Sequence, residues 1–249
     1  MWTRSLLKEN AKIVLRRTYW LSFLVCLVGG LLTGTSGAGA NYAYSYQSAS
    51  GSSGGNTGSS YIPPALAGLL ATTALLFFAV AIVYACFVAS PITVGYRRYF
   101  MEARGGNAPF SSLFSVFGKP GYLATVKTLF MTNLSIFLWS LLLVIPGIIK
   151  SYQYCMVPYI LAERPDMDYR RAMELSRQMT DGEKWNIFVL QLSFIGWELL
   201  GVLCFGIGLL FVTPYVEATM AELYTALRTK AMSLGQTDAS ELPGFIAYP

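Results

Sequence analysis

Residues 65–89 read ALAGLLATTALLFFAVAIVYACFVA, a run of apolar and small side chains without a single charge. The absence of charge extends in both directions, because no Lys, Arg, Asp or Glu occurs between Arg17 and Arg97. A helix that crosses a hydrocarbon core of about 30 Å needs about 20 predominantly apolar residues. The run at 65–89 is therefore predicted to span a membrane, and the chain is predicted to be an all-α integral membrane protein.

The composition of the chain excludes several classes of function. Charged residues make up 12% of the sequence, against about 25% in an average soluble domain. The sequence contains no histidine, which removes Ser-His-Asp and Cys-His catalysis and His-ligated zinc. Its four cysteines are isolated within apolar runs and are expected to behave as small apolar residues. We expect no enzyme, no catalytic residue, no cofactor, no metal and no nucleic-acid partner.

Further apolar segments predict a single membrane domain over residues 1–249, built as a bundle of six transmembrane helices. The predicted spans are 19–33, 65–89, 123–145, 147–162, 185–203 and, after a turn at 204–206, a last one that ends near 227. The fourth span is short, at about 24 Å of helix. The third and fourth spans are therefore either two crossings or a re-entrant pair. We favour two crossings, because the third span is long enough to cross alone.

The basic residues give the orientation. Of the 18 Lys and Arg residues, all except Lys150 fall in four short segments, at 4–17, 97–127, 164–184 and 228–230. Short loops rich in basic residues stay in the cytoplasm. We expect a multi-pass protein of the plasma (cell) membrane with both termini cytoplasmic, an amphipathic cytoplasmic segment at 1–17 and a cytoplasmic tail at 231–249. Its partners there would be the anionic headgroups of the lipid bilayer.

A polar segment at 34–61 follows the first span. It contains 7 Gly, 8 Ser and no charged residue, which predicts a mobile external loop that is dispensable for folding. The basic start, the apolar stretch and Ala38-Gly39-Ala40 are also compatible with a cleaved signal peptide. The distance between Ala40 and the end of the apolar stretch argues against cleavage.

The cytoplasmic loop at 163–184 contains an amphipathic pattern. Its apolar stripe lies at spacings i, i+3, i+4, i+7 and i+10 and consists of Tyr169, Ala172, Met173, Ser176 and Met179. This spacing predicts a helix over 168–179. The helix would lie either in the cytoplasmic interface of the membrane or against the bundle, because both locations use the same stripe.

Three charged residues fall at membrane depth: Lys150, Glu198 and Glu217. Each costs at least ~2.5 kcal/mol on insertion scales, so such residues indicate a functional site by default. Neutral polar residues complete the predicted intramembrane polar cluster: Asn133, Tyr152, Tyr159, Gln191 and Tyr215. Helix breaks are expected at Pro91, Pro146, Gly147, Pro158 and Pro214. The cluster either lines a path for a solute or fixes helix packing, with Lys150 paired to Glu198 and tyrosine hydroxyls bonded to Glu217.

Three blocks of sequence resemble a known family: IPGIIKSYQYCMVPYILAERPDM (145–167), AMELSRQMTDGEKWNIFVLQLSFIGWELL (172–200) and PYVEATMAELYTAL (214–227). They are similar to an uncharacterised bacterial integral-membrane family, domain of unknown function nine-seven-five. That family is distantly similar to the membrane domain of some glycerophosphodiester phosphodiesterases. The resemblance implies a six-helix polytopic protein without known catalysis, from which the long loop at 34–61 departs.

Two functions follow as hypotheses. The first is a non-enzymatic membrane protein that moves or binds a small solute, peptide or lipid through the polar cluster. The alternative is a membrane-anchored accessory subunit that docks a partner through its cytoplasmic helix at 168–179. Whether the protein forms a homo-oligomer or binds a protein partner stays open.

Overall fold

The computed structural model describes residues 2–33, 64–106, 108–117, 121–203 and 207–244, with side chains in the second range described from Thr72 onward. Within these ranges the chain forms helices and turns and contains no β-strand. The predicted all-helical class is therefore confirmed for the described residues. The predicted external loop at 34–61 and the turn at 204–206 lie outside them.

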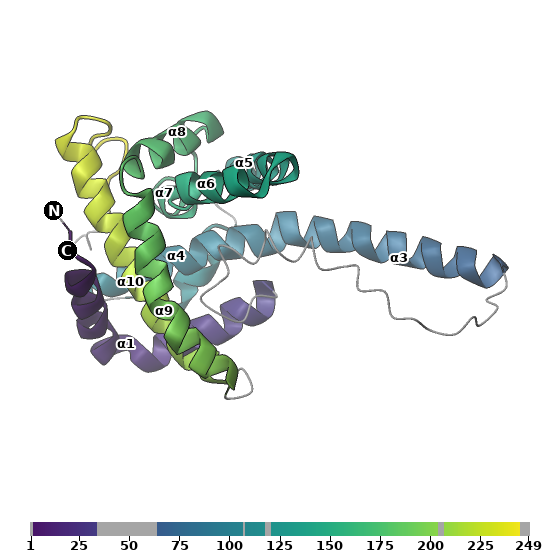
Figure 1. The fold of residues 1–249 in the computed structure, drawn as a ribbon, viewed down its shortest axis with the longest axis horizontal. Helices are drawn as coiled ribbons and strands as arrows, with labels where there is room; N and C mark the ends of the chain where they lie inside the picture. The colour runs from purple at the N-terminus through teal and green to yellow at the C-terminus, as the bar shows by residue number, and fades with distance from the viewer. Residues whose placement is uncertain (1, 34–63, 107, 118–120, 204–206, 245–249) are drawn as a thin grey trace.

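The helices are arranged around α10, which contacts α1, α4, α8 and α9. Figure 1 shows this arrangement, with α3 extending away from the other helices. In chain order the elements are α1 (Arg4–Thr33), α3 (Pro64–Tyr84), the π-helical turn η1 (Ala85–Ala89), α4 (Ser90–Arg104), the 3₁₀ turn η2 (Phe110–Phe114), α5 (Tyr122–Leu142), α6 (Val144–Tyr154), α7 (Val157–Glu163), α8 (Tyr169–Met179), α9 (Lys184–Leu203) and α10 (Ile207–Ser233).

Among the described residues, four helices are long and apolar enough to cross a membrane: α1, the continuous helix Thr72–Arg104, α5 and α9. These four helices support a helical membrane protein. The second of these helices contains most of the predicted span at 65–89, which is formed by α3 and η1. Helix α10 is long but carries the charged residues Glu217, Glu222, Arg228 and Lys230, which lower its hydropathy.

The predicted fourth span at 147–162 is not one helix. It divides into α6 and α7 at Cys155 and Met156. The cause is Pro158 in the first turn of α7, because proline has no N–H to donate to the carbonyl of Tyr154 four residues earlier. The break predicted at Pro146 and Gly147 occurs earlier in the chain, at Leu143. Pro146 and Gly147 themselves lie in the first half of α6.

At the two other prolines the helix continues, in contrast to the expected breaks. Pro91 lies in the first turn of α4, directly after η1. It removes the intrahelical donor for the carbonyl of Phe87, and the hydroxyl of Tyr122 donates to that carbonyl instead. Pro214 lies inside α10. Packing against α1, α4 and α9 holds that helix together despite the lost hydrogen bond.

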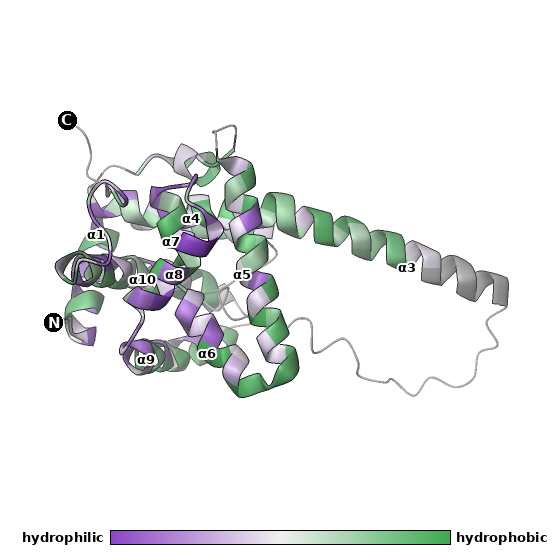
Figure 2. Cartoon of the chain, turned by 90° about the horizontal axis from the view of Figure 1, so that it is seen from above, coloured by the Kyte–Doolittle hydropathy of each residue, from purple (hydrophilic) through white to green (hydrophobic). Residues whose placement is uncertain are grey.

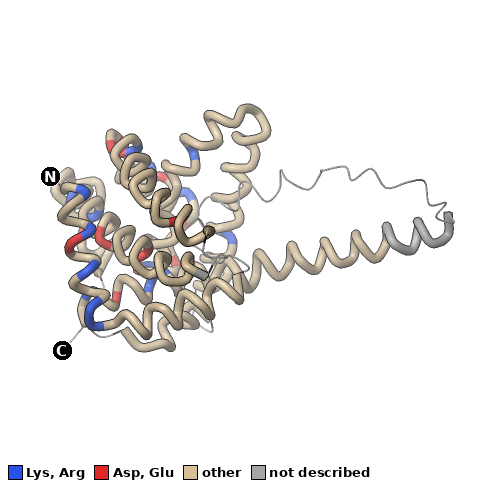
Figure 3. The backbone as a smooth tube through the Cα atoms, turned by 60° about the horizontal axis from the view of Figure 1, so that its bottom comes forward, with Lys and Arg blue, Asp and Glu red and all other residues tan. Residues whose placement is uncertain are grey.

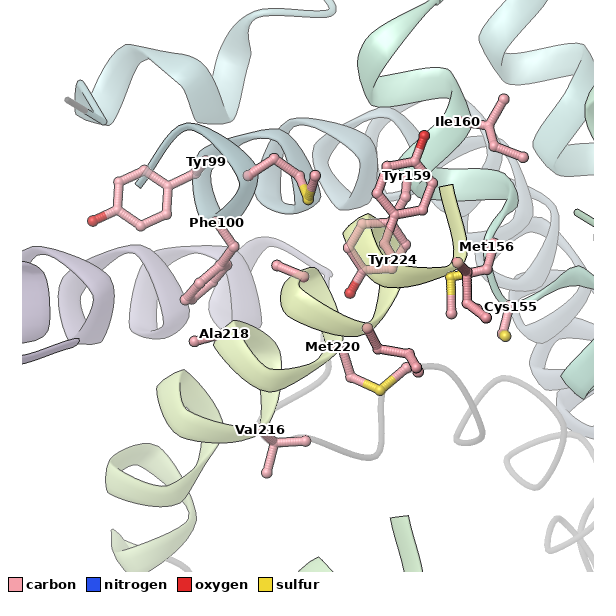
Figure 4. Packing of buried hydrophobic residues seen from close by; sticks show 14 of the residues in the cluster. Tyr99, Phe100, Cys155, Met156, Tyr159, Ile160, Val216, Ala218, Met220 and Tyr224 are labelled. Carbon is pink, nitrogen blue, oxygen red and sulfur yellow. The ribbon is translucent and has the colours of Figure 1, made fainter. Parts of the chain in front are cut away.

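Charged and apolar side chains occupy different parts of the molecule. Figure 3 shows Lys, Arg, Asp and Glu gathered in the part that holds both termini, whereas the described length of α3 has none. Figure 2 shows the hydrophobic residues of α3 and of the turn between α5 and α6. The well-packed core lies at the charged end, and Figure 4 shows part of it between α4, α7 and α10. This distribution is typical of a membrane protein with a compact polar end.

Helix α8 matches the predicted amphipathic helix at 168–179. Asp168 is its N-cap, because the Asp168 side chain accepts a hydrogen bond from the backbone N–H of Arg170 at 3.2 Å. Ala172, Ser176 and Met179 of the predicted stripe are buried, together with Leu175. The apolar face of α8 therefore packs against the bundle, which favours the second of the two expected locations.

Candidate functional site

A buried ion pair lies between α4 and α10. Arg97 of α4 and Glu217 of α10 contact each other directly, and their side chains are only 1% and 2% exposed. Two unlike charges taken out of water must compensate each other closely, because each one alone would be very costly to bury. Glu217 is one of the residues predicted from the sequence, whereas Arg97 was assigned to a cytoplasmic loop.

Tyrosine rings surround the guanidinium group of Arg97. Its Cζ lies 5.6 Å from the ring centroid of Tyr96 and 5.2 Å from that of Tyr159. Tyr159 in turn stacks on Tyr224 of α10, with ring centroids 5.3 Å apart and an interplanar angle of 17°. Figure 4 shows these two tyrosines side by side between α7 and α10. The cation therefore lies against aromatic faces, an arrangement that stabilises arginine away from water.

A second ion pair continues from Tyr224. The Tyr224 hydroxyl donates to one carboxylate oxygen of Glu163, and Nε of Arg228 lies 3.0 Å from the other. Burial raises the pKa of Glu163, while the Tyr224 hydroxyl and Arg228 act in the opposite direction. We call the whole set the buried polar core: Arg97, Tyr159, Glu163, Glu217, Tyr224 and Arg228.

A further ion pair joins α4 to α10, seven residues after Arg97 in α4. Arg104 places Nε 2.5 Å from one oxygen of Glu222 and Nη2 3.2 Å from the other. Its Nη1 donates to Thr225 Oγ1 at 2.6 Å. This bidentate contact fixes the register of α4 on α10 and so holds Arg97 opposite Glu217.

The structure brings together only part of the predicted polar cluster. Glu217 and Tyr159 belong to the buried polar core. Tyr152 donates to Gln191 at 2.9 Å, which links α6 to α9. Tyr215 packs edge-on against Phe194, with ring centroids 5.5 Å apart. The predicted residues in contact are thus divided among three places: the buried polar core, the Tyr152–Gln191 hydrogen bond and the Tyr215–Phe194 contact.

The remaining predicted residues lie apart from that core. Asn133 is exposed on α5, and Glu198 is half-buried on α9. Nζ of Lys150 lies 5.2 Å from the ring centroid of Trp139 and 5.6 Å from that of Tyr154. Among the described residues no ion pair joins Lys150 to Glu198, so the expected structural pair is replaced by cation–π contacts of Lys150.

Arg97 and Arg104 were not among the predicted site residues, because both were interpreted as loop charges that set the orientation. A signal was nevertheless present. Arg97, Phe100, Met101 and Arg104 follow the spacing i, i+3, i+4 and i+7 of one helix face. Two arginines that share a face with Phe and Met indicate a buried, paired face.

The buried polar core contains groups that are suited to non-covalent recognition. It offers a guanidinium group, carboxylates and phenol hydroxyls, which bind ionic and hydrogen-bonding groups. Among the described residues no group of three or more Cys, Asp or Glu side chains could hold a metal ion.

Comparison with known proteins gives one match. A family model described as "Protein of unknown function (DUF975)" matches residues 66–231, which is well over half of the chain. Searches of curated proteins and of solved structures found no match. The distant similarity to the membrane domain of glycerophosphodiester phosphodiesterases stays a prediction. The chain belongs to the DUF975 family of proteins of unknown function.

Proposed function

We propose that this chain is a non-enzymatic, multi-pass protein of the plasma membrane that binds or moves a small solute, peptide or lipid at its buried polar core. Both termini would lie in the cytoplasm, because all but one of the basic residues fall in segments assigned to that side. The number of crossings depends on whether the hairpin formed by α5 and α6 spans the bilayer.

The observation that carries this proposal is the ion pair between Arg97 and Glu217. Its two side chains are almost completely buried, in a chain whose described residues include four helices that are apolar enough to cross a membrane. Charged residues in such proteins face the protein interior and mark binding sites or pathways by default. The surrounding backbone is irregular: η1 precedes Arg97, and α6 and α7 are separated next to Tyr159. Discontinuous helices around a polar centre are typical of membrane proteins that bind substrates.

The chemistry of the pair favours a zwitterionic ligand. A guanidinium group binds a carboxylate or phosphate, and a carboxylate binds an ammonium group. A ligand that carries both charges can therefore replace each side chain as the partner of the other without leaving a charge unpaired. Peptides and phosphatidylethanolamine are ligands of this kind.

A thermal-shift measurement tests the proposal. The purified protein would be heated in detergent with dialanine or dihexanoyl phosphatidylethanolamine, and with the matched non-zwitterionic probes N-acetylalanine amide and dihexanoyl phosphatidylglycerol. We expect a zwitterionic probe to raise the melting temperature of the wild-type protein and of Arg98→Gln, a control on the same helix. The double variant Arg97→Met/Glu217→Leu should show no shift. Equal shifts in the double variant, or shifts with all four probes, would contradict the proposal.

A second candidate function is docking of a protein partner through α8. Its apolar face is occupied by the bundle, so only the outer face is available, where Arg170, Glu174 and Arg177 are exposed. Reversing two charges with Arg170→Glu/Arg177→Glu should leave the melting temperature unchanged and remove a co-purifying partner. Retention of the same partner by the variant would exclude docking through this face.

A further inference from the structure

The α5–α6 hairpin is held at its base by the segment that contains α8. The hydroxyl of Ser176 donates to the backbone carbonyl of Gln153, near the end of α6, at 2.7 Å. Thr180 Oγ1 lies 3.4 Å from the same carbonyl oxygen. On the other leg, Thr125 Oγ1 donates to the carbonyl of Pro165 at 3.0 Å. Both legs of the hairpin therefore leave the molecule from the level of α8.

Helix α8 lies outside the hydrocarbon of the membrane. Its outer face exposes Arg170, Glu174 and Arg177, and Asp166 and Asp168 precede it on exposed positions. Exposed charges at membrane depth would each cost at least ~2.5 kcal/mol. The carbonyl of Gln153 is hydrogen-bonded to α8 and therefore lies at the membrane surface as well.

The leg from Gln153 to the tip is too short to cross. Helix α6 contains 11 residues, which at about 1.5 Å per residue gives roughly 16 Å. The hydrocarbon core is about 30 Å thick. Because the shorter leg limits the depth of the hairpin whatever its tilt, the tip at Leu143 reaches no further than about the middle of the bilayer.

The tip itself is apolar and exposed. Five consecutive side chains, Leu141, Leu142, Leu143, Val144 and Ile145, are 63% to 74% exposed. Figure 2 shows this turn in the colour of hydrophobic residues. A turn that emerged on the far side of the membrane would place these side chains in water or among headgroups. Acyl chains are the surroundings that fit them.

The position of Lys150 agrees with a hairpin whose tip reaches only the middle of the bilayer. It lies seven residues from Leu143, about 10 Å along the helix, so it is close to the surface when the tip is at mid-membrane. Its alkyl chain lies near Trp139 and Tyr154, and its ammonium group can reach the lipid phosphates. Lys150 was the one basic residue that the six-span arrangement placed away from the others. If the hairpin returns to the side from which it enters, Lys150 lies on the same side of the membrane as the other basic residues.

We infer that the α5–α6 hairpin is a re-entrant element that inserts into one leaflet from the side of α8, with residues 141–145 among the acyl chains and Lys150 at the phosphates of that leaflet. Its partner is thus the phospholipid of a single leaflet. The inference replaces the third and fourth predicted crossings by one half-inserted hairpin, and it does not rest on ligand binding at the buried polar core.

The inference is tested by measuring which of two positions, 143 at the tip or 149 in α6, lies deeper in the membrane. Single cysteines would replace the exposed Leu143 and Ile149 in a protein whose four native cysteines are changed to alanine, with Arg177→Cys as the aqueous reference. Each protein is labelled with a nitroxide and reconstituted in phospholipid vesicles, and accessibility to oxygen and to a nickel chelate reports its depth. A re-entrant hairpin places position 143 deeper than position 149, whereas a crossing hairpin places 149 deeper than 143.

The expected result is a depth near the bilayer centre at 143 and a shallower one at 149. Equal or reversed depths would overturn the inference. Should Leu143→Cys fail to give folded protein, Ile145→Cys is the replacement tip position, since its side chain is more exposed than that of Leu143. For each variant, a circular-dichroism spectrum that is recorded before labelling and matches the wild-type spectrum shows that the protein is folded.

Discussion

Arg97 in α4 and Glu217 in α10 form an ion pair with almost no exposed surface on either side chain. Each residue is therefore the other's main compensation for leaving water. A buried pair of this kind adds little net stability over well-packed apolar residues, but removing one partner leaves an uncompensated charge. The two members are thus much more costly to change singly than together.

Single and double substitutions measure this coupling. Arg97→Met or Glu217→Leu alone should destabilise the protein by about 3–5 kcal/mol. The double variant Arg97→Met/Glu217→Leu should be clearly more stable than either single variant. Unfolding in detergent with increasing denaturant gives the three free energies. Additive losses in the double variant would show that the two side chains do not compensate each other.

A pair of glycine substitutions tests how η2 packs on α4. A Cβ at Gly95 would overlap the backbone carbonyl oxygen of Leu113, whereas a Cβ at Gly196 of α9 would meet nothing. Gly95→Ala should therefore destabilise the protein by about 1–3 kcal/mol or more. Gly196→Ala, the matched control, should be neutral or stabilise it by about 0.5–1 kcal/mol. Melting temperatures in detergent provide the comparison, and similar effects of both changes would refute the close contact.

Lys150 and Glu198 should behave independently. Because no ion pair joins them, the effects of Lys150→Met and Glu198→Leu on stability should add to within about 0.5 kcal/mol. Lys150→Met and Trp139→Leu should instead be coupled, by about 0.5–2 kcal/mol, through the cation–π contact. Double-mutant cycles on the free energy of unfolding measure both couplings. Recovery of stability in Lys150→Met/Glu198→Leu would restore the pair expected from the sequence.

The segment after α10 should loosen in acid. Arg171 of α8 binds Glu241 with Nε 2.6 Å from Oε1, and this hydrogen bond lowers the pKa of Glu241 against the effect of burial. A carboxyl group whose pKa is lower in the folded protein stabilises it above its unfolded pKa of about 4.3 and loses that effect as the pH falls below it. The contribution should be below about 1 kcal/mol, since the pair is partly exposed.

Melting temperatures between pH 6.5 and pH 3 check this dependence. The difference between the wild-type protein and Glu241→Gln should be present near neutral pH and should disappear as the pH falls through the folded pKa of Glu241. Glu174→Gln, which removes an exposed carboxyl group from α8, is the control. A difference that stays constant down to pH 3 would exclude the Arg171–Glu241 pair as its source.

Much of the helical framework could be predicted from local sequence. The apolar run at 65–89 and the stripe of α8 are properties of neighbouring residues, and the structure forms helix at both places. The division between α6 and α7 was less visible, although Pro158 caused it. Pro158 was predicted to break a helix, but the apolar segment around it is long enough to suggest a single span.

The pairing of polar residues could not be predicted in the same way. Depth along a span does not determine which helices are neighbours, so Lys150 and Glu198 looked like partners while Arg97 looked like a loop charge. The contact between Arg97 and Glu217 depends on α4 lying against α10, a tertiary arrangement that residue spacing alone does not specify. Only the shared helix face of Arg97 and Arg104 pointed to burial in advance.

Native mass spectrometry tests most directly the central claim that the buried polar core binds a zwitterionic small molecule. The protein would be purified in mild detergent, and the masses retained by the wild type, by Arg98→Gln and by Arg97→Met/Glu217→Leu would be compared. We predict an adduct of defined mass, identified as a zwitterion on release, that the wild type and Arg98→Gln retain and the double variant loses. An adduct of the same mass and occupancy on the folded double variant, or none on the wild type, would contradict the claim.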